Sequence, residues 1–170
     1  MRRGDFSRAE RRPVKPRFRS LLPLGALVLE AAISDATAQQ RPYNPSLGDL
    51  MTATVQPRHT KLGLATREGN WPYAAYELHE LKEAFDRAAK VWPKWRTFSI
   101  SEMMASVTKE PMAALERAIM AGDPNRVTTA YEQLTAACNT CHRSADRGMI
   151  VIQSPTSSSF PDQDFRPVKQ

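Results

Sequence analysis

The sequence predicts an all-α protein: an antiparallel four-helix bundle with an extended C-terminal tail. Three observations lead to this prediction. Apolar residues recur at helical spacing through most of the chain after residue 45. A capping residue, often followed by proline, stands where most of the helices are expected to begin, and glycine or proline stands where they are expected to end. The chain of 170 residues is long enough for one domain with its own core, and no internal repeat is present.

The first expected helix spans residues 46–67. Ser46 can cap it, and Asp49 places negative charge in its first turn, where the helix dipole favours it. Pro57 removes a backbone hydrogen bond from the middle of this segment, so we expect a bend there or a helix in two pieces. Its apolar face consists of Leu47, Leu50, Met51, Val55, His59 and Leu62.

The second expected helix begins at Asn70-Trp71-Pro72, a cap followed by a proline in the first turn, and ends at Pro93. Its apolar residues are spaced alternately by four and three, which is typical of a bundle helix. They are Ala74, Leu78, Leu81, Phe85, Ala88 and Trp92.

Residues 94–108 carry a weaker pattern, and we expect only a short helical turn around residues 103–107. The third helix is expected to begin near Glu110-Pro111 and to end at Gly122, a favourable left-handed cap. The fourth opens with Asp123-Pro124. Its stripe again alternates by four and three: Val127, Tyr131, Leu134, Cys138 and Cys141.

Residues 1–38 resemble a cleavable secretory signal. A basic stretch is followed by a short apolar run, small residues and Ala36-Thr37-Ala38, with cleavage expected after Ala38. The apolar run is too short for a membrane span. We therefore expect three parts: a signal at residues 1–38, a helical domain at 39–148, and a tail at 149–170 that Phe160 and Phe165 can anchor. A disordered basic tail that binds an acidic partner is the alternative for the first part.

The net charge of +6 is concentrated in the first segment. Without residues 1–38, 16 basic and 14 acidic side chains remain. The folded part is therefore nearly neutral, and we expect neither nucleic-acid binding nor stable membrane insertion after signal cleavage.

Cys138-Asn139-Thr140-Cys141-His142 matches the c-type haem attachment motif. Two thiols three residues apart on one helical face can add to the two vinyl groups of one haem, and the following imidazole can bind the iron. A zinc site would need four ligands, and a redox-active cysteine pair would be expected at a strand–helix junction. Two structural cysteines followed by an incidental histidine are the remaining alternative.

The ligand on the other side of the iron decides the function. In the predicted bundle the end of the fourth helix lies beside the start of the first. This favours Met51 as the distal ligand, on the opposite side of the iron from His142. His59 lies about 12 Å further along the helix axis and is the alternative, as is an open position with no protein ligand. We expect four further side chains to line the pocket: Tyr131, Leu134, Leu50 and Val55.

The haem motif and the helix pattern make residues 46–147 resemble the class II cytochromes c. This four-helix family comprises the cytochromes c′ and their low-spin, Met/His-ligated relatives. The most specific element is the position of the motif, late in the last helix. The chain departs from the family at Ala145 and Asp146, where an aromatic and a basic residue are usual, and in its long tail. The resemblance implies one covalent haem c per chain and a homodimer.

These observations together predict an exported, periplasmic one-electron carrier that exchanges electrons with redox partner proteins. Two alternatives stay open: a protein that binds nitric oxide or carbon monoxide at an open iron position, and a haem-containing helper subunit of a larger complex. We do not expect an enzyme, because no catalytic constellation appears away from the motif. The carboxylates of Glu77, Glu80, Glu83 and Asp86 are typical of a solvated helix face.

Overall fold

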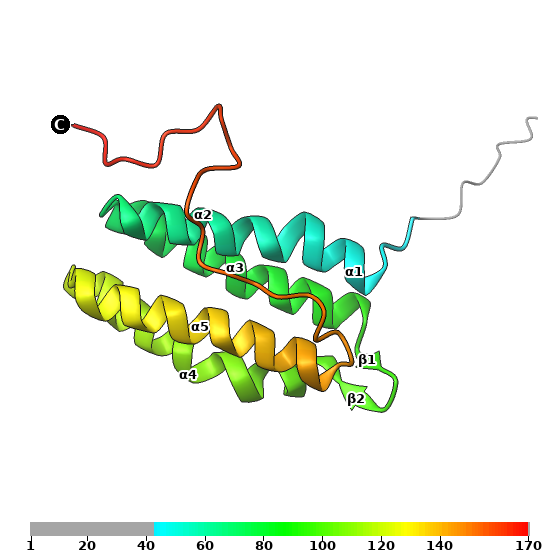
Figure 1. Ribbon diagram of the computed structural model, residues 1–170. Coiled ribbons are helices and arrows are strands. Elements are labelled where there is room, and N and C mark those ends of the chain that lie inside the picture. Colours follow the sequence, from blue (N-terminus) through cyan, green and yellow to red (C-terminus); the bar gives the residue numbers. More distant parts are fainter. Residues whose placement is uncertain (1–42, 170) are drawn as a thin grey trace, which may run out of the picture. The chain divides into compact units, whose positions relative to one another are not determined.

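A computed structural model describes residues 43–169 of the chain. This part is mostly helical, with one small two-stranded sheet (Figure 1). Among its helices, none is both long and apolar enough to cross a membrane. The expected secretory signal, residues 1–38, lies outside the described residues.

The first helical segment has three parts: α1 (Leu47–Leu50), a π-helical turn η1 (Met51–Val55) and α2 (Gln56–Arg67). Ser46 caps it as expected, because its hydroxyl accepts a hydrogen bond from the Asp49 amide at 3.1 Å and the Asp49 carboxylate accepts one from the Ser46 amide at 2.9 Å. Pro57 cannot donate an α-helical hydrogen bond. The expected interruption is present as the wider π turn just before it, in which the Gln56 amide donates to the Met51 carbonyl.

The second helix, α3 (Trp71–Val91), has the boundaries that the sequence predicts. The Asn70 side chain accepts from the Tyr73 amide at its start. At its end, the Trp92 indole donates to the Pro45 carbonyl at 2.8 Å, which ties the end of α3 to the chain just before α1.

The prediction for residues 94–111 is wrong. Two short strands, β1 (Lys94–Trp95) and β2 (Phe98–Ser99), form a hairpin, and α4 (Ile100–Ala121) follows directly and continues through Pro111. Its buried face is continuous across the proline: Ile100, Met104, Thr108, Met112, Leu115, Ala118 and Ile119. Burial of this long face outweighs the cost of about 3 kcal/mol that a proline imposes within a helix.

The last helix, α5 (Pro124–Ser144), begins where the sequence predicts. Gly122 has the left-handed backbone conformation that ends α4, with φ of 62°. The Asp123 carboxylate then accepts hydrogen bonds from the amides of Asn125 and Arg126, both at 3.1 Å. Only Gly122 and Asp123 thus separate the two helices.

The helices pack through their apolar faces. Contacts join α2 to α3, α3 to α4, α4 to α5, and α2 to α5. The centre of this packing is formed by fully buried leucines, namely Leu62, Leu78, Leu81, Leu115 and Leu134. A second, smaller cluster of Leu50, Ala88, Ile100 and Met104 lies toward the β hairpin.

The C-terminal tail turns back after α5 and runs over the helices toward α2 (Figure 1). Arg67 donates to the Pro155 carbonyl at 3.0 Å, and Asn70 donates to the carbonyls of Phe165 and Arg166. Phe165 is buried and Phe160 is half-buried, so both pack against the helices as expected.

One expectation about α3 is wrong. Glu77 does not lie on a solvated face but is buried, 1 % exposed, where it accepts hydrogen bonds from Arg58 and from the Tyr73 hydroxyl. A buried carboxylate is tolerated only with such partners. Gln163 donates to the same Tyr73 hydroxyl at 2.7 Å, so the tail belongs to this network.

Candidate functional site

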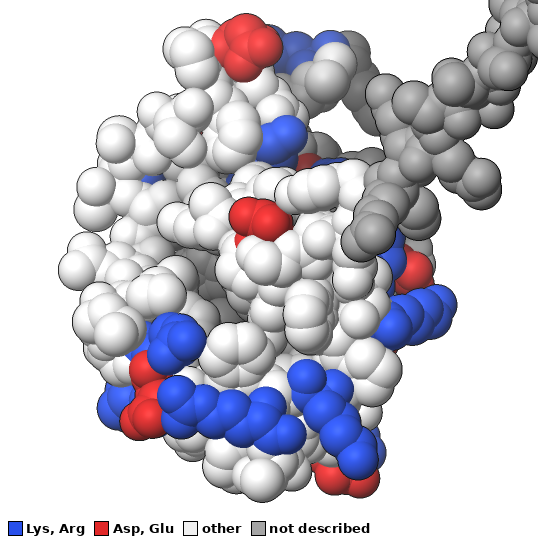
Figure 2. All heavy atoms as spheres, turned by 90° about the vertical axis from the view of Figure 1, so that its right-hand side faces the viewer, with Lys and Arg blue, Asp and Glu red and all other residues white. Residues whose placement is uncertain are grey.

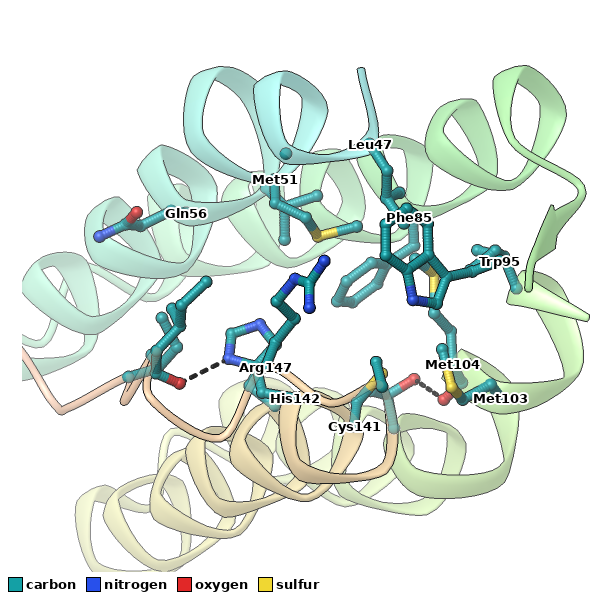
Figure 3. A pocket seen from close by; sticks show the side chains of 18 of the residues that line it. Leu47, Met51, Gln56, Phe85, Trp95, Met103, Met104, Cys141, His142 and Arg147 are labelled. Atoms are coloured by element: carbon teal, nitrogen blue, oxygen red, sulfur yellow. Dashed lines mark hydrogen bonds between the residues drawn. The ribbon is translucent and has the colours of Figure 1, made fainter. Parts of the chain in front are cut away.

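A cavity of about 190 Å³, partly open to solvent, lies where the α1–η1 segment, the start of α4 and the end of α5 meet (Figure 3). Its walls are mostly apolar, with contributions from Val55, Phe85, Ile100, Met104 and Ile152. A mostly apolar cavity with a few polar groups is typical of a ligand or cofactor site. Figure 2 shows the end of the molecule that carries the β hairpin: Lys and Arg gather on its lower part, and most of the remainder carries no charge.

Helix α5 brings Cys138 and Cys141 to the wall of this cavity, one turn apart on one face. Both are free thiols. Burial raises the pKa of Cys138 to about 11, and burial also raises the pKa of Cys141. Redox-active cysteine pairs need a thiolate and therefore a lowered pKa. These thiols stay protonated at neutral pH, which disfavours the interpretation as a redox pair.

His142 lines the same cavity and is held in a defined orientation. Its Nδ1 lies 2.8 Å from the backbone carbonyl oxygen of Ile150. A carbonyl oxygen can only accept, so Nδ1 carries the proton and Nε2 keeps its lone pair in the neutral ring. Metal-bound histidines are oriented by this kind of hydrogen bond. The His142 ring is thus prepared to act as a nitrogen ligand through Nε2.

Met51 lies on the opposite side of the cavity. Figure 3 shows its side chain entering from the α1–η1 segment, across from His142 on α5. Met51 is the first residue of the π turn and is half-buried. Its thioether is a neutral sulfur donor that suits haem iron.

His59 also lines the cavity, but both of its ring nitrogens already have partners. Nε2 lies 2.9 Å from the Thr135 hydroxyl, and Nδ1 lies 3.1 Å from the Tyr131 hydroxyl. Burial lowers the pKa of His59 to about 4, so the ring is neutral at physiological pH. These partners compete with any metal for its lone pair and favour a structural role.

The burial of His59 predicts a pH dependence of stability. Its pKa is about 4 in the folded chain and about 6.5 in an unfolded one, so the unfolded state binds more protons between these values. The free energy of unfolding should therefore fall by about 3 kcal/mol as the pH drops from 6.5 to 4. Urea unfolding of the protein and of His59→Gln measures this. An equal slope in both proteins would exclude His59 as its source.

The structure places the other expected pocket residues in two groups. Val55 lines the cavity together with Met51, Cys138, Cys141 and His142. Three others are buried but are not among the lining residues: Leu50, Tyr131 and Leu134. Tyr131 instead donates a hydrogen bond to the His59 carbonyl at 2.8 Å, and Leu134 is fully buried in the main core.

Several lining residues were not predicted to face the site, above all Trp95, Phe85, Met103 and Met104. The spacing of Ile100, Met104, Thr108 and Met112 in steps of four was a signal for the early start of α4. Trp95 carries a distinctive feature: its indole nitrogen is buried without a hydrogen-bond partner in the described part of the chain. The Arg147 guanidinium, which also lines the cavity, stacks on the Trp95 ring at 5.1 Å. A buried donor without a partner is costly, so this cavity is suited to a ligand that brings an acceptor.

The donors around the cavity fit a c-type haem. Two protonated thiols and one imidazole project from α5, a thioether faces them, and the walls between are apolar. Trp95 and Arg147 offer an N–H donor and a positive charge, which suit the carboxylates that a haem carries. Within residues 43–169 no three His, Cys, Asp or Glu side chains are grouped to hold a metal ion among themselves. The chain matches no known family model, no curated protein and no solved structure.

Proposed function

We propose that this chain is an exported c-type cytochrome with one covalent haem c, and that it acts as a one-electron carrier. The observation that carries the proposal is the convergence on one apolar cavity of Cys138, Cys141 and His142 from α5 and of Met51 from the opposite side. The three α5 residues lie within five positions of one another in the sequence, whereas Met51 is far from them. Only the fold brings Met51 to the same cavity.

Cys138 and Cys141 are the covalent anchors. Each thiol adds across one vinyl group: an S–C bond forms to one vinyl carbon and the thiol hydrogen goes to the other, so no oxidant or reductant is consumed. Their spacing of one helical turn on α5 allows both to reach one macrocycle. Both thiols are partly buried, which raises their pKa values.

In this proposal His142 and Met51 would hold the haem iron. The Ile150 carbonyl holds the His142 ring with Nε2 free, while the His59 nitrogens are engaged elsewhere. Met51 is therefore the better distal candidate. When bound, the haem supplies one-electron exchange between ferric and ferrous iron. Val55, Phe85 and Ile100 would shield part of the bound haem from solvent, and an apolar surround of this kind tunes the reduction potential.

The finer architecture belongs to the same proposal. We infer that α1–α2, α3, α4 and α5 form an antiparallel four-helix bundle, supported by contacts between α2 and α3, α3 and α4, α4 and α5, and α2 and α5. In this proposal residues 1–38 act as the export signal, and the carrier works in the periplasm with redox partner proteins. Two arguments support the periplasmic location. Residues 1–38 match an export signal, and bacteria attach haem covalently to cytochromes c outside the cytoplasm.

The test is to express the chain in a bacterial host that exports it and matures cytochromes c. We expect one haem that stays bound in denaturing solvent, with a mass increase of one haem per chain. The ferric spectrum should be low-spin, with the weak red band of a methionine sulfur–iron bond.

A ferric high-spin spectrum with rapid carbon monoxide binding on reduction would contradict the electron-carrier proposal and support gas binding at an open position. Haem that extracts into acidified solvent would contradict covalent attachment. Recovery of the haem protein only in a stable complex with another chain would favour the helper-subunit alternative.

A further inference from the structure

The C-terminal tail makes a direct contact with the proposed haem ligand. Residues 147–152, which we call the strap, follow α5 and turn back along it. The Arg147 amide donates to the His142 carbonyl at 2.7 Å, and the Ile150 amide donates to the Arg147 carbonyl at 2.9 Å. This turn brings the Ile150 carbonyl to the His142 Nδ1, as the dashed line in Figure 3 shows.

A second attachment comes from inside the motif. The Asn139 side chain pairs with the backbone of Ile152 at two points: the Ile152 amide donates to Oδ1 at 2.7 Å, and Nδ2 donates to the Ile152 carbonyl at 2.8 Å. Asn139 and His142 are three residues apart and therefore share one face of α5. The strap thus runs back along this face, with Ile150 fixed at His142 and Ile152 fixed at Asn139.

Hydrogen bonds, more than burial, hold the strap in place. Met149, Ile150 and Val151 are 78 %, 48 % and 63 % exposed, so their apolar side chains contribute little packing. Of its side chains, only Arg147 and Ile152 are half-buried. Further along, the tail is fixed to α2 and α3 through Pro155 and Phe165. The Ile150 carbonyl therefore depends for its position on the turn at Arg147 and on the Asn139 clamp.

We propose that Asn139 is a positioning residue that acts through the strap on His142. By clamping Ile152, it keeps the Ile150 carbonyl at the Nδ1 proton and so fixes the tautomer and the orientation of the ring. A hydrogen bond donated from Nδ1 makes Nε2 a better electron donor. Asn139 thereby lowers the reduction potential of the bound iron. This inference rests on the proposed function, because it assigns a role to Asn139 at the same site.

The test compares Asn139→Ala, Asn139→Asp and Thr140→Ala with the unaltered protein. Thr140 is the matched control: it occupies the other variable position of the motif, is exposed, and forms its side-chain hydrogen bonds within α5, to Ala136 and Arg143. Amide hydrogen exchange reports on the clamp, and a spectroelectrochemical titration gives the reduction potential.

In Asn139→Ala we expect exchange of the Ile152 amide to accelerate about tenfold, because two hydrogen bonds are lost. The reduction potential should rise in the same variant. Asn139→Asp can still accept from the Ile152 amide but cannot donate to its carbonyl, so both effects should be intermediate. Thr140→Ala should show neither.

Two results would overturn the inference. Unchanged exchange at Ile152 in Asn139→Ala would mean that Asn139 does not hold the strap. Accelerated exchange with the potential of the Thr140→Ala control would make Asn139 a structural residue without influence on His142.

Failure of the proposed function is a separate outcome, recognised by the absence of covalent haem from the unaltered protein. The ¹⁵N shifts of His142 then decide the question. A tautomer that changes in Asn139→Ala supports the clamp without haem, and an unchanged tautomer overturns it.

Discussion

Replacement of Cys138 and Cys141 together by serine should abolish covalent haem attachment completely. Serine is nearly isosteric with cysteine, but its hydroxyl does not add to a vinyl group under conditions in which a thiol does. Both side chains lie on the cavity wall and are only partly buried, so the fold should tolerate the exchange. Mass spectrometry of the exported protein should show the mass of the chain without haem, and haem staining of a denaturing gel should be negative.

The single variants test the contribution of each cysteine to haem attachment. With one thioether left, Cys138→Ser and Cys141→Ser should each hold less haem than the unaltered protein but more than the double variant. Thr140→Ala, at an exposed position between them, should keep full haem content. Covalent haem in the double variant would show that these cysteines are not the anchors. Circular dichroism separates lost attachment from lost folding.

The fold was predictable where local signals and burial agree. Asn70 before Trp71-Pro72 and Asp123 before Pro124 mark helix starts that the structure confirms, because each side chain caps free amides in the first turn. The prediction failed at Pro111. Proline is favourable at the start of a helix and costly inside it, and the sequence alone does not show that Ile100, Met104 and Thr108 are buried on the face that continues to Met112.

The site was predictable to the extent that its residues are adjacent in sequence. Cys138, Cys141 and His142 form a motif, and Met51 followed from helix order, and all four line one cavity. Trp95 was not predictable, because it lies in a two-residue strand without periodicity and its role depends on an unpaired N–H. The hydrogen bond between the Ile150 carbonyl and His142 was also not predictable, because every residue has a backbone carbonyl and the residue type does not indicate its partner. Glu77 was misjudged because its partner Arg58 belongs to another helix.

Replacement of Met51 by alanine should remove the distal ligand and convert a six-coordinate, low-spin iron into a high-spin one. Alanine has no atom that can bind iron. The His59 nitrogens, which could replace the sulfur, are hydrogen-bonded to Thr135 and Tyr131. The ferric spectrum should lose its methionine band, and the ferrous protein should bind carbon monoxide rapidly. The reduction potential should also fall, because thioether ligation favours the ferrous state. Optical spectra and a redox titration measure all three effects.

Met51 is one of three methionines around the cavity, and the other two provide the comparison. Met103 and Met104 project from the start of α4, and Figure 3 shows them near Cys141, whereas Met51 faces His142 from the α1–η1 side. If Met103→Ala or Met104→Ala abolishes the methionine band and Met51→Ala keeps it, the distal sulfur comes from α4. A low-spin spectrum in all three variants would instead point to His59, and Met51→Ala combined with His59→Gln would then be high-spin. Met120→Ala, which alters a side chain that is 82 % exposed, controls for general effects of losing a thioether. The π turn that begins at Met51 favours Met51 as the ligand, because such turns shift the register of a helix and often occur at functional sites.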